Sequence, residues 1–289
     1  MRYLLATIVL AASLPAAAQT ATEATRAAIA RVERLNPLVG AVIGLDPTAL
    51  QQAQAIDRGR RARGGLYGMA LLIKDNIETA GPLPTTAGSL ALVDNVSGRD
   101  APLVARLRAA DAVILGKTNL SEWANMRSGV SISGWSAVGG QTRNPHALNR
   151  NPCGSSSGSG AAVASGMVDA AIGTETDGSI TCPAAVNGIV GLKPTVGLVS
   201  RDRIVPISGS QDTAGPMARD VRTAARVLAA IADPASDYLG ALQPGALRGV
   251  RIGVLRFATG WSVPVDALFE AALGVMRAQG ATLVDIAAL

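Results

Sequence analysis

Short apolar runs alternate with helix-like patterns along most of the chain, and this alternation restricts the fold more than any other feature. Apolar runs such as 70–73 and 112–115 have the length and composition of buried strands. The segment 102–110 between them repeats apolar residues at helical spacing, and Asp220 supplies an N-cap before another such segment. This order predicts a layered α/β domain with helices on both faces of a sheet. Further strands are expected at 168–173, 189–192, 250–255 and from 282, and further helices at 22–36, from 46, and at 268–276.

Proline and capping residues suggest where the first two helices begin and end. The segment 22–36 places Ile29, Val32 and Leu35 on one face. We expect this helix to stop at Pro37, because proline lacks the N–H that a helix interior uses. The pair 46–47 is Asp-Pro, which is typical of an N-cap followed by the first helical position.

The composition is that of a folded protein. Hydrophobic residues make up 48% of the 289 positions and charged residues 16%, which argues against disorder. The formal net charge of +5 is small for this length, no basic run reaches five residues, and aromatic residues make up only 3%. These values disfavour nucleic acid as a partner. With one histidine and no cluster of metal ligands, neither a metal nor another cofactor is expected.

The first eighteen residues have the features of a secretory signal. Arg2 gives a positive start, residues 3–14 form a short apolar stretch, and 16–18 are three alanines suited to cleavage. The stretch is shorter than the roughly 20 apolar residues that span a bilayer. We therefore expect residues 1–18 to be removed, leaving a single domain over 19–289 in the periplasm or outside the cell, with no membrane contact.

The two cysteines and the end of the chain each leave a question open. Cys153 and Cys182 would permit one disulfide in an oxidising compartment, but the favoured interpretation is two small buried thiols. The last predicted strand begins at Thr282 and the sequence ends at Leu289. A sheet that begins a new strand so near the end leads us to expect an N-terminal portion of a longer protein.

Three segments carry residues suited to acyl transfer. Lys74 ends an apolar strand, and lysine occurs at only two other positions. Burial that lowers its pKa from about 10.4 to near 7 would cost roughly 4 kcal/mol and would make it a base. A Gly/Ser-rich loop, 152–160, leads into a helical run. Ser179 lies in 173–180 at a strand-to-helix turn, where backbone N–H groups can stabilise an oxyanion.

Two other interpretations of these segments remain. The residues around Ser156 match G-x-S-x-G, but the only histidine, His146, precedes the serine instead of following it. A histidine beyond the end of the sequence could complete such a triad. The Gly/Ser-rich loop could alternatively hold a phosphate at the start of its helix, although it fits neither dinucleotide nor P-loop spacing.

Several further segments stand in a fixed order with the three above. The full set is Lys74 in its strand, 116–123 (GKTNLSEW), 154–160 (GSSSGSG), 176–179 (TDGS), 191–195 (GLKPT) and 212–217 (DTAGPM). Taken in order, these motifs resemble those of the amidase signature family, whose members are longer chains. The similarity runs from about Leu35 to the end, and the variants of two motifs look most like those of bacterial exported peptide amidases.

The resemblance implies an α/β/α layered domain with a central mixed sheet, and a Ser–cis-Ser–Lys triad. Ser179 would be the nucleophile, Ser155 would relay the proton from a cis Gly154–Ser155 peptide, and neutral Lys74 would be the base. The backbone N–H groups of Thr176, Asp177, Gly178 and Ser179 would form the oxyanion hole.

The implied reaction is hydrolysis of small carboxylic amides or peptide C-terminal amides to acid and ammonia. Asp177 replaces a glycine usual in the family, and Thr181 replaces a frequent arginine, so we expect a shifted substrate preference. Two alternatives are the glutamine-hydrolysing subunit of a tRNA-dependent amidotransferase, which works inside the cell with partner subunits, and an inactive fragment. The acyl group, the leaving amine and the oligomeric state stay open.

Overall fold

The computed structural model describes residues 19–59 and 62–288, and these fall into two compact units that divide after Asp233. The predicted signal segment 1–18 lies outside the described residues. The prediction of one domain over 19–289 stays a prediction. None of the helices in the described ranges is long and apolar enough to cross a membrane.

The larger unit is built on a six-stranded mixed sheet with the order β1-β3-β2-β6-β8-β7. The three central strands β3, β2 and β6 run parallel to one another, while β1, β8 and β7 each pair antiparallel. This confirms the layered α/β fold with a mixed sheet. The strands are β1 Val42–Leu45, β2 Ala70–Lys74, β3 Val113–Thr118, β6 Ala170–Glu175, β7 Val190–Gly191 and β8 Thr213–Ala218, and a separate hairpin pairs β4 Trp135–Ser136 with β5 Gly140–Gln141.

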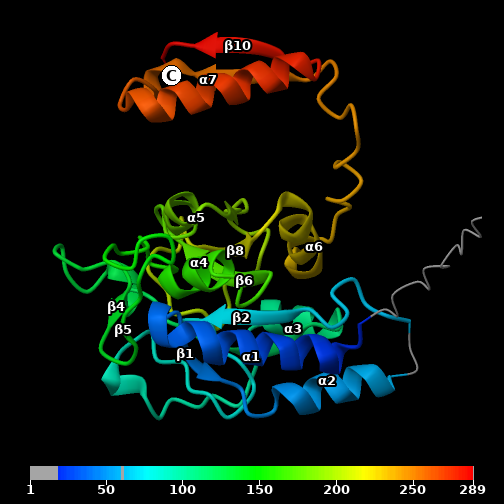
Figure 1. Ribbon diagram of the computed structural model, residues 1–289, viewed down its shortest axis with the longest axis vertical. Coiled ribbons are helices and arrows are strands. Elements are labelled where there is room, and N and C mark those ends of the chain that lie inside the picture. Colours follow the sequence, from blue (N-terminus) through cyan, green and yellow to red (C-terminus); the bar gives the residue numbers. More distant parts are fainter. Residues whose placement is uncertain (1–18, 60–61, 289) are drawn as a thin grey trace, which may run out of the picture. The chain divides into compact units, whose positions relative to one another are not determined.

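Helices cover both faces of this sheet (Figure 1). Residues of α1, α2 and α4 form one apolar core with the alternate strand residues Leu72, Val113 and Leu115. None of the residues of α3 and α6 belongs to that core, and these two helices contact each other, β3 and β8, which places them on the opposite face. The helices are α1 Ala21–Val39, α2 Ala49–Arg58, α3 Pro102–Ala109, α4 Ser157–Ala164, α5 Thr181–Asn187 and α6 Val221–Ile231, with 3-10 turns at Leu90–Leu92 and Glu122–Asn125.

Two predicted helix boundaries were wrong and one was confirmed. Helix α1 continues through Pro37, because a proline in the last turns removes only one hydrogen bond of the helix. The helix ends at Gly40, whose N–H donates to Asn36 O at 2.7 Å. Helix α2 begins only at Ala49. Asp220 caps α6 as predicted, accepting from Thr223 N at 2.8 Å.

The smaller unit contains a parallel pair of strands joined by one helix. Strands β9 (Arg251–Leu255) and β10 (Thr282–Ile286) pair in register, and α7 (Val263–Ala278) connects them after a 3-10 turn at Arg256–Ala258. The helix ends before Gly280, which has the positive φ of 95° expected at that position.

Candidate active site

Lys74 is the last residue of β2, and its side chain is fully buried. Its side-chain nitrogen Nζ donates to Ser155 Oγ at 2.7 Å and to Thr174 Oγ1 at 2.8 Å. Strands β2 and β6 are parallel neighbours, so their carboxyl ends meet at one edge of the sheet. That edge is where open α/β sheets commonly place their binding sites.

Burial lowers the pKa of Lys74 from 10.5 to about 7, because the ammonium form loses its hydration in this interior. The carboxylates of Glu175 and Asp212 favour the charged form and oppose this shift. An amine with a pKa near 7 is largely neutral just above neutral pH. Lys74 therefore has the electrostatics that a general base requires.

Ser155 lies in the Gly/Ser-rich loop that leads into α4, and its peptide bond with Gly154 is cis. The loop is tightly packed, since Ser155 and the two serines that follow it are fully buried. A Cβ added to Gly154 would lie 2.3 Å from Ser121 Oγ, and one added to Gly158 would lie 2.3 Å from Ala41 O. Only glycine fits at these two positions, so the loop is a rigid part of the site.

Ser179 lies in the turn between β6 and α5, as predicted, and is largely buried. The backbone N–H groups of residues 176–179 donate none of the hydrogen bonds found outside helices and strands in the described chain. Glu175 holds the far side of this turn, because its Oε2 accepts from Ile180 N at 2.6 Å and from Thr181 N at 2.8 Å. The turn thus offers unpaired donors beside a buried hydroxyl, which is the arrangement of an oxyanion site.

The two serine-bearing turns are joined directly. Ser156 N donates to Ser179 O at 3.1 Å, and a disulfide links Cys153 to Cys182 across a Cα–Cα distance of 6.0 Å. The expectation of two unbonded thiols was wrong, because folding brings the two turns together and places the cysteines, 29 positions apart, within bonding range. Among the described residues no hydrogen bond joins the hydroxyls of Ser155 and Ser179. Lys74 and Ser155 are therefore in hydrogen-bond contact, while the proton relay between Ser179 and Lys74 through Ser155 stays a prediction.

The alternative interpretations find no support in the described residues. The Ser156 hydroxyl donates to Thr174 O at 3.0 Å and accepts from Thr174 N. His146 Nε2 instead pairs with Asn187 O at 2.9 Å. The loop is also a poor phosphate cradle, because the N–H groups of Gly158 and Gly160 already donate to backbone carbonyls.

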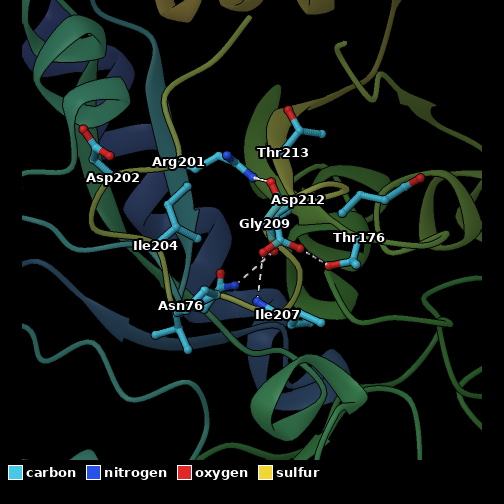
Figure 2. A pocket seen from close by; sticks show the side chains of 13 residues that line it. Asn76, Thr176, Arg201, Asp202, Ile204, Ile207, Gly209, Asp212 and Thr213 are labelled. Atoms are coloured by element: carbon cyan, nitrogen blue, oxygen red, sulfur yellow. Dashed lines mark hydrogen bonds between the residues drawn. The ribbon is translucent and has the colours of Figure 1, made fainter. Parts of the chain in front are cut away.

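A cavity of about 190 Å³ lies against the end of β6 and the residues that follow it. Its walls come from three separate segments, as Figure 2 shows: the turn that follows β2, the end of β6, and the stretch from 201 to 213. Residues that line it include Asn76, Thr174, Glu175, Thr176, Arg201 and Asp212. Within the described ranges no group of three or more His, Cys, Asp or Glu side chains could hold a metal ion.

Thr174, Glu175 and Asp212 contribute to this site, but the sequence analysis, which named the segments 173–180 and 212–217, gave none of the three a role. Glu175 and Thr174 sit in the segment that carries Ser179, so the termination of an apolar strand by polar residues was the available signal. Asp212 is more than 30 residues away, and nothing in the local pattern indicates that β8 would pair with β6.

Comparisons with known proteins show the family and the fold of this chain. The family model described as Amidase matches residues 23–288. A native peptide amidase from Stenotrophomonas maltophilia is 54% identical, with a TM-score of 0.87 over 93% of this chain and 59% of that one. An amidase family protein from Bacillus anthracis is 35% identical, with a TM-score of 0.87 over 94% of this chain and 58% of that one.

Curated relatives include a glutamyl-tRNA(Gln) amidotransferase subunit from Anaeromyxobacter dehalogenans, which is 42% identical over 95% of this chain and 58% of its own length. Relatives from Arthroderma benhamiae and Arabidopsis thaliana are 44% and 42% identical over 89% and 88% of this chain. The chain spans 47% and 52% of those two, about half the length of the curated relatives it matches. By the family model and these identities, the chain belongs to the amidase signature family.

Proposed function

We propose that this chain carries the catalytic centre of an amidase that hydrolyses carboxylic amides, including C-terminal amides of peptides, to acid and ammonia. The observation that carries the proposal is the hydrogen bond from the buried amine of Lys74 to Ser155 Oγ, at 2.7 Å, in a lysine whose pKa is about 7. The similarity to a peptide amidase supports peptide amides as the substrate class.

In the proposed reaction, each of the three side chains has one role. Ser179 Oγ attacks the amide carbonyl carbon while its proton passes to Ser155, whose own proton passes to the neutral Lys74 amine. The carbonyl oxygen becomes an oxyanion, which the N–H groups of residues 176–179 stabilise. The relay returns a proton to the leaving nitrogen, the carbon–nitrogen bond breaks, and ammonia departs. Water then attacks the acyl-enzyme through the same relay, releasing the acid and restoring Ser179.

Ammonia release from a peptide carboxamide tests the proposal. We expect release by the wild-type chain and none by Ser179→Ala. Activity of Ser155→Ala should also fall by a large factor, since this change removes the link between the base and the nucleophile. Because the chain spans about half the length of its relatives, the assay is run in parallel on a version extended by the residues encoded downstream. Release by the extended version alone would identify the present chain as an inactive fragment.

A second candidate is the glutamine-hydrolysing subunit of a tRNA-dependent amidotransferase, favoured by the relative from Anaeromyxobacter dehalogenans. That function requires glutamine as the amide donor and partner subunits that use the ammonia released. Ammonia release from a peptide amide without any partner would support the peptide amidase. Release from glutamine that depends on added partner subunits would support the amidotransferase.

We also propose that the chain is exported to the periplasm or secreted. The bond between Cys153 and Cys182 supports this, because disulfides persist in oxidising compartments. Fractionation of cells that express the chain with and without residues 1–18 tests it. Equal retention of both forms in the cytoplasm would contradict export.

A further inference from the structure

The pairing between β6 and β8 stops one residue short of the catalytic turn. The backbone ladder between these antiparallel strands ends at Glu175 and Thr213. The next residues outward are Thr176 on one strand and Asp212 on the other. Their side chains continue the ladder by one step, because Thr176 Oγ1 donates to Asp212 Oδ1 at 2.5 Å (Figure 2). This bond is the last attachment before the chain turns through Asp177 and Gly178 to Ser179.

The second carboxylate oxygen of Asp212 anchors the opposite wall of the cavity. Its Oδ2 accepts from Ile207 N at 2.8 Å and from Ser208 N at 2.9 Å. The segment before these residues is itself attached to the turn that follows β2, since Val205 N donates to Asn76 O at 2.9 Å. These hydrogen bonds hold the Asp212 carboxylate in place. Its Oδ1 is therefore a fixed acceptor for the Thr176 hydroxyl.

The catalytic turn has two independent side-chain anchors as a result. Glu175 fixes the side that enters α5, through the N–H groups of residues 180 and 181. The bond from Thr176 to Asp212 fixes the side that leaves β6. A hydrogen bond to a charged acceptor contributes more than one between neutral groups. Four adjacent backbone donors between two such anchors have little freedom to turn away from the reacting carbonyl.

We infer that Asp212 is a positioning residue for the oxyanion hole, acting through the Thr176 hydroxyl to hold the N–H groups of residues 176–179 in the orientation that the transition state needs. The inference rests on the proposed function, because it assigns Asp212 a role in that same reaction. It predicts a loss in kcat with little change in KM, since the substrate is bound before the oxyanion forms.

Thr176→Val removes the hydroxyl donor at nearly constant side-chain shape, and Thr176→Ser keeps the donor. With a peptide carboxamide substrate, we expect Thr176→Val to lower kcat about 10- to 100-fold, less than the 10²- to 10³-fold loss of an oxyanion donor itself. Thr176→Ser should stay within about threefold of wild type. The matched control is Thr223→Val, which removes a Thr–Asp hydrogen bond of 2.8 Å at the start of α6 and should leave kcat unchanged.

A peptide aldehyde separates positioning from folding, because its adduct with Ser179 carries an oxyanion-like oxygen. Thr176→Val should weaken aldehyde inhibition by the same factor as kcat. Binding of the carboxamide to Ser179→Ala should be unaffected when Thr176→Val is added. Equal loss of both kinds of binding would overturn the inference in favour of a general structural role.

A double-mutant cycle tests whether Asp212 acts through Thr176. Asp212→Asn combined with Thr176→Val should lose less activity than the product of the two separate losses. A combined loss equal to that product would overturn the link, as would a Thr176→Val enzyme as active as wild type. If the wild-type enzyme releases no ammonia from any amide while its aldehyde adduct forms normally, the proposed function fails, and the aldehyde series still decides the positioning role.

Discussion

The pKa of Lys74 makes the most exacting prediction, because one value sets both the neutral fraction of the proposed base and the contribution of this residue to stability at each pH. If the neutral amine is the base, kcat/KM for a peptide amide follows the neutral fraction of Lys74. With a pKa of about 7, we expect about half of the maximal rate at pH 7, roughly one tenth at pH 6 and roughly nine tenths at pH 8. The acidic limb of the profile should therefore have an apparent pKa near 7.

The same shift predicts how stability changes with pH. Burial lowers the folded-state pKa of Lys74 from 10.5 to about 7, so between these values the unfolded chain binds more protons than the folded one. The free energy of unfolding therefore rises with pH across this window, by about 1.4 kcal/mol per pH unit from this residue and about 5 kcal/mol in total. Below pH 7 the amine is protonated in both states and the slope vanishes.

Lys74→Met isolates these effects, since it keeps the apolar part of the side chain and removes the titrating amine. We expect no measurable amide hydrolysis at any pH, and a stability advantage over wild type that shrinks by about 2 to 3 kcal/mol between pH 7 and pH 9 in urea denaturation. The control is Lys193→Met, which removes an exposed lysine outside the site. A difference for Lys74→Met that is flat with pH, or an acidic limb that persists without the amine, would refute the assignment of Lys74 as a buried neutral base.

Two further predictions concern the surroundings of the site. Lys117→Met should destabilise the protein by about 3–5 kcal/mol in urea denaturation, because it leaves the buried carboxylate of Asp75 without its charge partner. The lysine nitrogen lies 3.4 Å from that carboxylate. A destabilisation as small as that of Lys193→Met would contradict this prediction. Replacing Cys153 and Cys182 together by serine should lower the free energy of unfolding by about 3–4 kcal/mol, since the bond closes a loop spanning 29 positions. Thiol titration of the denatured, untreated chain should find no reactive thiol, and two thiols would contradict the bond.

The elements that the sequence predicted are those whose pattern is local. The strand at 70–73, the helix at 102–110 and the cap at Asp220 each follow from a few neighbouring residues, and each was confirmed. Strand β8 was missed because its sequence contains a glycine followed by a proline, which disfavour a strand interior. It pairs along its whole length with β6, and over part of it with β7, because tertiary contacts outweigh this local preference.

The residues of the candidate site also divide into those that a local pattern indicates and those that only tertiary contacts bring together. Lys74, the Gly/Ser-rich loop and the turn at Ser179 were identified because each lies at the end of a recognisable element. Asp212 was not assigned a role, because its importance depends on the register between two strands. The sequence left open whether Cys153 and Cys182 form a disulfide and favoured two separate thiols, and only the contact between their two turns shows that they form a bond.

The protonation of Lys74 depends on the position of the neighbouring carboxylate of Asp75. Asp75 is adjacent in sequence and fully buried, and its carboxylate would hold the lysine charged if the two faced each other. Asp75, the first residue after β2, instead contacts Lys117 and Thr86. Burial raises the pKa of Asp75 and lowers that of Lys117, while their mutual attraction opposes both shifts. The side chain of Lys117, whose partners in the described chain are Ile77, Thr85 and Asp75, thus balances a negative charge next to the proposed base.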